Sequence, residues 1–184
     1  EWDCTLEPPT AEKPALRLGL RVVSGLSAEG AQRLVDARAQ RSFNDIADLV
    51  HRARLNRHDR EALAQADALA PLAGHRHRAR WQALGSERLP GLLAGHAAAE
   101  PAPELPTPRE GEEIVADYAS TGLTLRRHPV ALLRPRLRRL GVRSADDLDR
   151  LEDGCALRVA GLVINRQRPG TAHGTMFMTL EDET

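Results

Sequence analysis

Apolar side chains recur at helical intervals over most of the chain, and the first such stretch follows a tight turn. Between residues 28 and 39 they fall three and four positions apart, on one face of a helix: Ala31, Leu34, Val35 and Ala39. Ser27 can cap this helix, because its hydroxyl can accept a hydrogen bond from an amide of the first turn. Gly25 permits the turn that joins the helix to an apolar-rich segment at 16–23. The pattern therefore predicts an apolar segment, a glycine turn and an amphipathic helix.

Residues 42–74 repeat this arrangement without repeating its residues. We expect Ser42 to cap one helix and a second helix to run from Arg57 to Leu69. Their inner faces are expected to carry Phe43, Ile46, Leu49 and Val50 in the first helix, and Leu63, Ala66 and Leu69 in the second. The sequence thus predicts an internal repeat of elements.

A basic helix and a linker come next. Residues 75–85 are expected to form a short helix anchored by Trp81 and Leu84. Residues 86–111 are rich in Pro, Ala and Gly, which is typical of a linker, and we expect its middle to be mobile. From 112 to 151 the helical pattern returns.

Residues 155–184 change to a strand pattern. The first strand carries Val159, Leu162, Val163 and Ile164, and the second places Met176, Met178 and Leu180 on one side. This hairpin resembles the start of an OB-type barrel. Because two strands alone are marginally stable, we expect the barrel to be truncated in this sequence.

These patterns predict a mostly α fold: a tandem helix-hairpin-helix region, a linker, further helices and a terminal β hairpin that begins an OB-type barrel. The expected divisions are an extended tail at 1–15, the helix-hairpin-helix region at 16–85, the linker at 86–111, a helical segment at 112–151 and the truncated OB-fold start at 155–184.

Composition narrows the class of protein. The net charge is zero, but Lys13 is the only lysine among 26 basic residues, and arginine offers a planar fork that suits phosphate. A GC-rich genome also explains the arginines. No apolar run approaches the roughly 20 residues that cross a membrane, and residues 1–15 do not resemble a secretory signal. With Cys4 and Cys155 as unpaired thiols, we expect a cytoplasmic protein without a membrane partner.

Catalytic and metal-binding patterns are missing from the sequence. His75 and His77 have no ligand partners at metal-site spacing, and three successive acids at 181–183 cannot converge on one metal from a strand. There is no phosphate-binding Walker loop and no GxSxG motif. We expect no catalytic residue, metal site or cofactor in this segment.

The glycine turn is the strongest candidate for function. Its four residues are Ser24, Gly25, Leu26 and Ser27. They resemble a helix-hairpin-helix turn, which directs backbone N–H groups at a helix start toward a phosphate. Arg33 and Arg38 on the following helix are expected to flank the bound strand, although Ser27 replaces the usual second glycine. The plainer interpretation is a turn that only joins two helices.

Other basic segments are weaker candidates. Residues 126–143 contain seven arginines and no acid, and residues 75–80 form a second basic stretch; either can be a solvated helix face. Arg166 and Arg168, next to Asn165 and Gln167, are candidates for single-stranded DNA binding on an OB-type surface.

Several long segments resemble the C-terminal half of bacterial family C DNA polymerase α subunits. They are LRLGLRVVSGLSAEGAQRLVDARA (16–39), the stretch from Phe43 to Gln82, and RVAGLVINRQRPGTAHGTMFMTLEDET (158–184). The phrases WDCTLE, TGLTLRRHP and GLVINRQRPGTA are most similar to the error-prone branch, called ImuC.

The resemblance implies a parent polymerase that acts in damage-induced mutagenesis and translesion synthesis. Its catalytic acids and Mg²⁺ would lie in a polymerase core outside this segment. It implies that the Ser24–Ser27 hairpin contacts the primer-template duplex through its phosphates, without sequence specificity. It also implies the sliding clamp and mutasome accessory proteins as partners. Two alternatives stay open: a protein-interaction scaffold that binds mutasome partners without touching DNA, and a free-standing repair scaffold.

Overall fold

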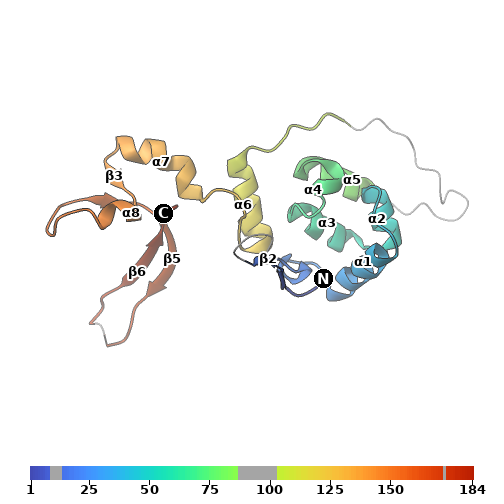
Figure 1. The fold of residues 1–184 in the computed structure, drawn as a ribbon, viewed down its shortest axis with the longest axis horizontal. Helices are drawn as coiled ribbons and strands as arrows, with labels where there is room; N and C mark the ends of the chain where they lie inside the picture. The colour runs from blue at the N-terminus through green and yellow to red at the C-terminus, as the bar shows by residue number, and fades with distance from the viewer. Residues whose placement is uncertain (9–13, 87–102, 172) are drawn as a thin grey trace, which may run out of the picture. The chain divides into compact units, whose positions relative to one another are not determined.

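The computed structural model describes residues 1–8, 14–86, 103–171 and 173–184 (Figure 1). It divides into two compact units, Glu1–Leu123 and Thr124–Thr184, which are described separately. The first unit is mainly helical, the second combines two helices with two strand pairs, and the chain as a whole is mostly helical, which confirms the predicted fold class. The boundary between them falls inside 112–151, which we expected to be one helical segment. Most of the linker whose middle we expected to be mobile lies outside the described residues.

The first unit contains two short strands, one 3-10 helix and six α-helices among its described residues. They are β1 (Thr5–Glu7), β2 (Ala15–Arg17), η1 (Leu20–Val22), α1 (Ala28–Gln40), α2 (Ile46–Arg52), α3 (Arg57–Gln65), α4 (Ala70–Ala73), α5 (Arg76–Gly85) and α6 (Glu110–Thr121). Helices α1 to α5 gather around one apolar core (Figure 1). The most deeply buried large side chains of that core belong to Ile46, Leu63 and Leu69.

The N-terminal residues are extended, as expected, but they do not form a free tail. β1 pairs with β2 in an antiparallel arrangement. The amides of Leu20 and Arg21 donate to the carbonyls of Glu1 and Trp2, each at 3.0 Å. The start of the chain is therefore held against the segment that leads into α1.

The buried face of α1 differs from the predicted one. On α1, Ala37 is buried with Ala31 and Leu34, whereas Val35 is half-buried and Ala39 is exposed. The helical face that meets the core follows a spacing of three at Leu34 to Ala37, which the pattern did not distinguish from a spacing of four. The consequence is a narrower apolar face than the sequence suggested.

The start of α2 was also predicted wrongly. Asp45, not Ser42, caps this helix, because the Asp45 carboxylate accepts from the amide of Asp48. Phe43 therefore lies before the helix, where it packs partly against the core beneath the Arg52 guanidinium. Serine and aspartate cap helices about equally well, so the difference is one of position: α2 begins at Ile46, which makes Asp45 the cap residue.

α5 is not anchored by Trp81 and Leu84. Ala79 and Ala83 are fully buried, while Trp81 is 40% exposed. α5 packs against α3, α4 and α2. A helix enclosed by three others has room for methyl groups on its inner face, so the large indole lies outside. The basic stretch 75–80 is also partly internal, since Arg76 is buried.

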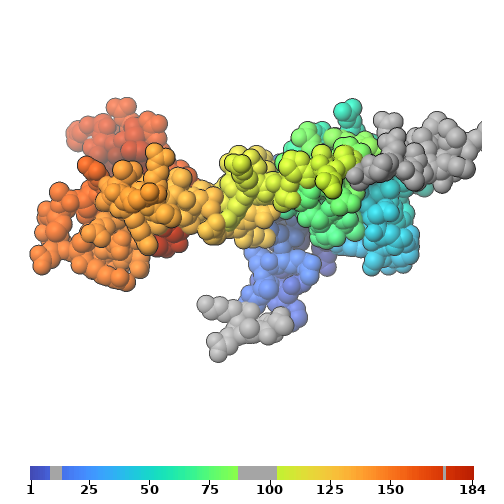
Figure 2. All heavy atoms as spheres, turned by 90° about the horizontal axis from the view of Figure 1, so that it is seen from above, coloured from blue at the N-terminus to red at the C-terminus, as the bar shows by residue number. Residues whose placement is uncertain are grey.

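The second unit contains helices α7 (Pro129–Arg139) and α8 (Ala145–Leu148) and strands β3 (Val142–Arg143), β4 (Arg158–Val159), β5 (Leu162–Gln167) and β6 (Phe177–Glu181). In the space-filling view of Figure 2 it is coloured from yellow-orange to red. β3 pairs with β4 in parallel, and β5 pairs with β6 as the antiparallel hairpin that the sequence predicted. Whether this hairpin begins an OB-type barrel stays a prediction.

A buried ion cluster joins α7 to the end of β6. The Arg134 guanidinium donates to Glu183 and, at 3.0 Å, to Asp182 Oδ2. The hydrogen bond with Glu183 raises the pKa of Arg134, and the same contact lowers the pKa of the Glu183 carboxyl. Burial alone would raise the pKa of Asp182, but hydrogen bonds from Thr184 and Ala145 lower it below its ordinary value. The acidic residues that follow β6 thus tie it to α7 and to the start of α8.

No helix in the described ranges is long and apolar enough to span a membrane.

Candidate nucleic-acid interface

The first hairpin joins η1 to α1 through a tight turn. Gly25 has φ +82°, in the left-handed region that a glycine adopts without strain. Ser24 and Gly25 are exposed, whereas the flanking Val23 and Leu26 are buried in the core. Ser27 caps α1 as predicted, since its hydroxyl accepts from the amide of Gly30 at 3.0 Å. The apolar residues fix the turn from inside and leave its tip in solvent.

A second hairpin of the same construction joins α2 to α3. Arg54 has φ +48° and occupies the place of Gly25, and the buried Leu55 occupies the place of Leu26. Asn56 caps α3 by accepting from the amide of Asp59 at 2.8 Å, as Ser27 caps α1. The geometry therefore confirms the predicted internal repeat and locates its second tip at residues 54–58.

The two tips lie side by side. The Ser27 amide donates to Asp59 Oδ1 at 2.9 Å, so the start of α1 contacts the first turn of α3. A Cβ placed on Gly25 would lie 3.2 Å from Nε2 of His58. Because both contacts cross between the hairpins, their exposed residues form one continuous surface, which we call the tip surface (residues 24–29 and 54–58).

Three amides of the first tip are already occupied. The Ser24 N–H donates to the Ser120 carbonyl at 2.7 Å, the Leu26 N–H to the Val23 carbonyl at 3.2 Å, and the Ser27 N–H to Asp59. Of the four residues that were predicted to contact a phosphate, Gly25 is the one whose amide has no acceptor among the described residues.

A different set of amides is available at the tip surface. Within the described part of the chain, no acceptor is bonded to the N–H groups of Gly25, Ala28, Glu29, Arg57 and His58. All except Gly25 are first-turn amides, which a helix cannot satisfy internally. The positive end of each helix dipole increases the positive electrostatic potential at these amides. The tip surface can thus present several donors to one anionic chain.

The two arginines that were predicted to flank the bound strand lie at different distances from the tip surface. Arg33 is half-buried, its Nε donates to the Ala53 carbonyl at 3.1 Å, and its guanidinium lies 3.7 Å from Asp59. Arg38 is exposed but lies in the last turn of α1, ten residues beyond Ala28, which is about 15 Å along a helix. Arg33 therefore lies beside the tip surface with its charge paired to Asp59, whereas Arg38 lies away from it.

The second tip carries two arginines and a histidine that were not among the predicted site residues. Arg54, Arg57 and His58 are exposed there, while Glu29 is the acid of the first tip. The signal was present in the sequence, because Arg54-Leu55-Asn56 follows the same order of turn residue, apolar residue and helix cap as Gly25-Leu26-Ser27. Arginine in place of glycine concealed it.

The terminal hairpin separates residues that the sequence analysis grouped. Arg166 pairs with Met178, whereas Asn165 pairs with Thr179 and Gln167 with Phe177. Successive residues of a strand point to opposite faces, so Arg166 lies on the apolar methionine face and the two amides lie on the other. Arg166 Nε donates to Met176 Sδ at 3.0 Å, and Arg168 is exposed beyond the end of β5.

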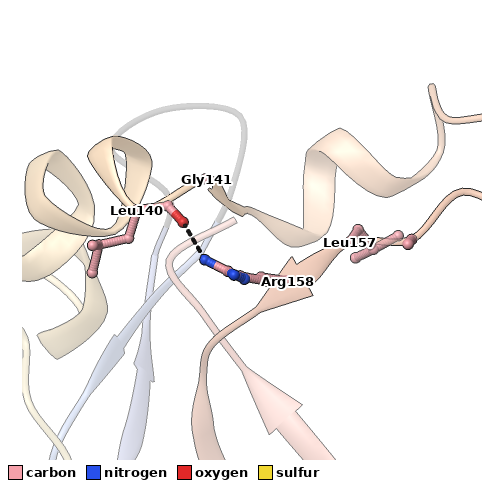
Figure 3. Close-up of a pocket in the computed structure, with 5 residues that line it drawn as sticks. Leu140, Gly141, Leu157 and Arg158 are labelled. Carbon is pink, nitrogen blue, oxygen red and sulfur yellow. Dashed lines mark hydrogen bonds between the residues drawn. The ribbon is translucent and has the colours of Figure 1, made fainter.

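A shallow hollow in the second unit is lined by Leu140, Gly141, Ala156, Leu157 and Arg158 (Figure 3). Its one charged side chain points across the hollow, where Arg158 donates to the Leu140 carbonyl at 3.3 Å. The described residues contain no group of three side chains able to hold a metal ion. The hollow thus offers neither a nucleophile nor a general base.

Comparison with known proteins adds to this geometry. Residues 1–79 match the family model of the helix-hairpin-helix motif. Over 100% of its length the chain is 51% identical to the error-prone DNA polymerase of Methylococcus capsulatus (strain ATCC 33009 / NCIMB 11132 / Bath). The whole chain is homologous to a segment of the error-prone DNA polymerases. It is also 53% identical over 100% of its length to the enzyme of Alkalilimnicola ehrlichii (strain ATCC BAA-1101 / DSM 17681 / MLHE-1).

The chain spans less than a fifth of these polymerases, 19% and 18% of their lengths. A third homologue, the error-prone DNA polymerase of Xanthomonas campestris pv. campestris (strain B100), is 52% identical over 99% of the chain, which covers 16% of that enzyme. The homology therefore concerns one segment, and within it the matched motif includes both hairpin tips.

Proposed function

We propose that the first unit binds the backbone of duplex DNA, without sequence specificity, as a non-catalytic part of an error-prone DNA polymerase. The observation that carries the proposal is the tip surface, where two helix starts expose unbonded amides side by side. The helix-hairpin-helix match and the homology with error-prone DNA polymerases support it. The proposed contact therefore involves two hairpins rather than Ser24 to Ser27 alone.

The chemistry of the tip surface suits phosphate. Amides at Gly25, Ala28 and Glu29 would donate to one phosphate and those at Arg57 and His58 to another, each assisted by a helix dipole. The side chains of Arg54 and Arg57 would neutralise neighbouring phosphates, and Arg57 can do so in a bidentate way. The Glu29 carboxylate opposes this attraction, so the second tip would contribute more. Since only backbone groups of the DNA are contacted, binding would not depend on base sequence.

The same proposal extends to the parent protein. Its polymerase activity in translesion synthesis, within the ImuC branch, would require a Mg²⁺-holding core outside this segment. The hairpin of β5 and β6 would continue into an OB-type barrel, where Arg166 and Arg168 would contact single-stranded DNA. The sliding clamp and mutasome accessory proteins would be partners, in the cytoplasm.

Salt dependence of DNA binding tests the proposal. We expect the chain to bind a fluorescein-labelled primer-template duplex at low salt. The logarithm of the binding constant should fall by about 2 to 4 for each tenfold rise in salt, because two to four phosphates are neutralised. Fluorescence anisotropy measures this, with two duplexes of unrelated sequence as mutual controls. Absence of binding at low salt would refute the proposal and favour the protein-interaction scaffold.

A further inference from the structure

We infer that Asp59 is a positioning residue that couples the two hairpins into one binding element. This inference rests on the proposed function, because it concerns how the tip surface is held together. Asp59 is 0% exposed, so it cannot itself touch DNA. Asp59 would affect DNA binding only indirectly, by fixing the positions of the helix starts to which it is bonded.

Asp59 is bonded to the cap residues of both hairpins. Its own amide donates to Oδ1 of Asn56, the cap of α3, at 2.8 Å. Its carboxylate accepts from the amide of Ser27, the cap of α1, at 2.9 Å and from the Ser27 hydroxyl at 3.1 Å. One side chain therefore links the start of α1 to the start of α3, although the two caps are 29 positions apart in the sequence (56 − 27 = 29).

The surroundings of Asp59 are fitted to a charged carboxylate. Arg33 lies 3.7 Å from Oδ2 and supplies the compensating charge that a buried anion needs. Arg33 also donates to the Ala53 carbonyl at the end of the helix that leads into the second tip. Gly30 leaves the space for the carboxylate, because a Cβ at that position would overlap Asp59 Oδ2.

This arrangement explains the place of Ser27 in the first hairpin. The Ser27 amide donates to Asp59 and is therefore not available to a ligand. The Ser27 hydroxyl donates to Asp59 and accepts from the Gly30 amide. Because this bond joins the two helix starts, the unbonded amides at Ala28 and Glu29 keep a fixed separation from those at Arg57 and His58. A fixed separation between two donor sets lowers the entropy cost of binding both phosphates at once.

Three variants of the full chain test the coupling. Asp59→Asn keeps an oxygen for the Ser27 amide and is expected to bind duplex DNA within about threefold of the wild type, while Asp59→Leu removes both bonds and should lose about tenfold or more. Ser27→Ala removes the hydroxyl, and with it both the bond to Asp59 and the capping bond from the Gly30 amide, but keeps the backbone bond to Asp59, so its affinity should fall between the two. Asp45→Leu is the matched control, since Asp45 caps α2 but makes no bond to the tip surface in the described structure.

Amide hydrogen exchange at Ser27 provides a second measurement that does not depend on DNA. Protection should be kept in Asp59→Asn and Asp45→Leu and lost in Asp59→Leu. Should Asp59→Leu not fold, two results decide the matter: the affinity should fall in the order wild type, Asp59→Asn, Ser27→Ala, and the amide at position 27 should stay protected in both folded variants because its bond to the residue at position 59 is kept. The inference is overturned if Ser27 protection survives in Asp59→Leu, or if Asp59→Asn loses protection and affinity as Asp59→Leu does.

The two proposals fail in different ways. If the wild-type chain binds no duplex DNA, the proposed function is refuted, while the exchange at Ser27 still shows whether Asp59 couples the hairpins. If the wild type binds DNA and Asp59→Leu binds equally well, the tips act independently and only the coupling is refuted.

Discussion

Reversing the charges of Arg54 and Arg57 together is expected to weaken binding of duplex DNA by about 10- to 100-fold at low salt. Both side chains are exposed at the second tip, beside the unbonded amides of Arg57 and His58. The double variant Arg54→Glu/Arg57→Glu replaces two cations that would neutralise phosphates with two anions that repel them. The slope of the logarithm of the binding constant against the logarithm of the salt concentration should also decrease in magnitude by about 2, because two fewer phosphates are neutralised. Fluorescence anisotropy at several salt concentrations measures both effects.

A control with the same change of net charge separates a local contact from general attraction. Arg38→Glu/Arg41→Glu lies at the opposite end of α1 from the tip surface. The control loses the ion pair of Arg41, whose side chain is 54% exposed, with Asp48; because Asp48 keeps its ion pair with Arg52, this loss costs about 1 kcal/mol of stability or less. We expect this control to lose less than about threefold in affinity. Equal losses in the two double variants would place the contact elsewhere.

Replacing Arg76 with methionine is expected to lower the free energy of unfolding by about 3–5 kcal/mol. Its guanidinium is buried, donates to the Gln65 carbonyl at 2.8 Å, and forms ion pairs with Glu113 at 2.9 Å and with Asp117. Methionine would leave two partly or fully buried carboxylates without this cation. Chemical denaturation monitored by tryptophan fluorescence, to which Trp2 and Trp81 contribute, measures the change.

Arg80→Met is the matched control for Arg76→Met. Arg80 lies one turn later on α5, and its ion pair with Glu61 is 54% exposed at the arginine side chain. A surface pair of this kind contributes about 0–1 kcal/mol, so the control should unfold almost as the wild type does. A loss below about 1 kcal/mol for Arg76→Met would mean that α6 is not held by this cluster.

The elements that follow from local chemistry could be predicted from the sequence. Ser27 was identified as a cap because an acceptor one position before an apolar periodicity satisfies a first-turn amide. The β5–β6 hairpin followed from alternation of apolar residues. Such signals lie within a few residues of the feature that they predict.

Contacts between distant residues could not be predicted in this way. Asp59 reaches Ser27 across 32 positions and Arg76 reaches Asp117 across 41, and neither pair leaves a periodic signal in the sequence. The left-handed turn at Arg54 could not be predicted because glycine is the usual residue at such a turn. An arginine adopts φ +48° here, where the residues on both sides of it, Ala53 and Leu55, are buried. The second tip was thus concealed by one residue type.

An NMR titration of the ¹⁵N-labelled chain with a short DNA duplex tests the central claim most directly. We predict that the largest changes in amide chemical shift fall at Gly25, Ala28 and Glu29 in the first hairpin and at Arg57 and His58 in the second. The amide of Ser27 should keep its bond to Asp59 and change less. Largest changes at residues 134–143 or on the β5–β6 hairpin, with both tips unchanged, would contradict the account.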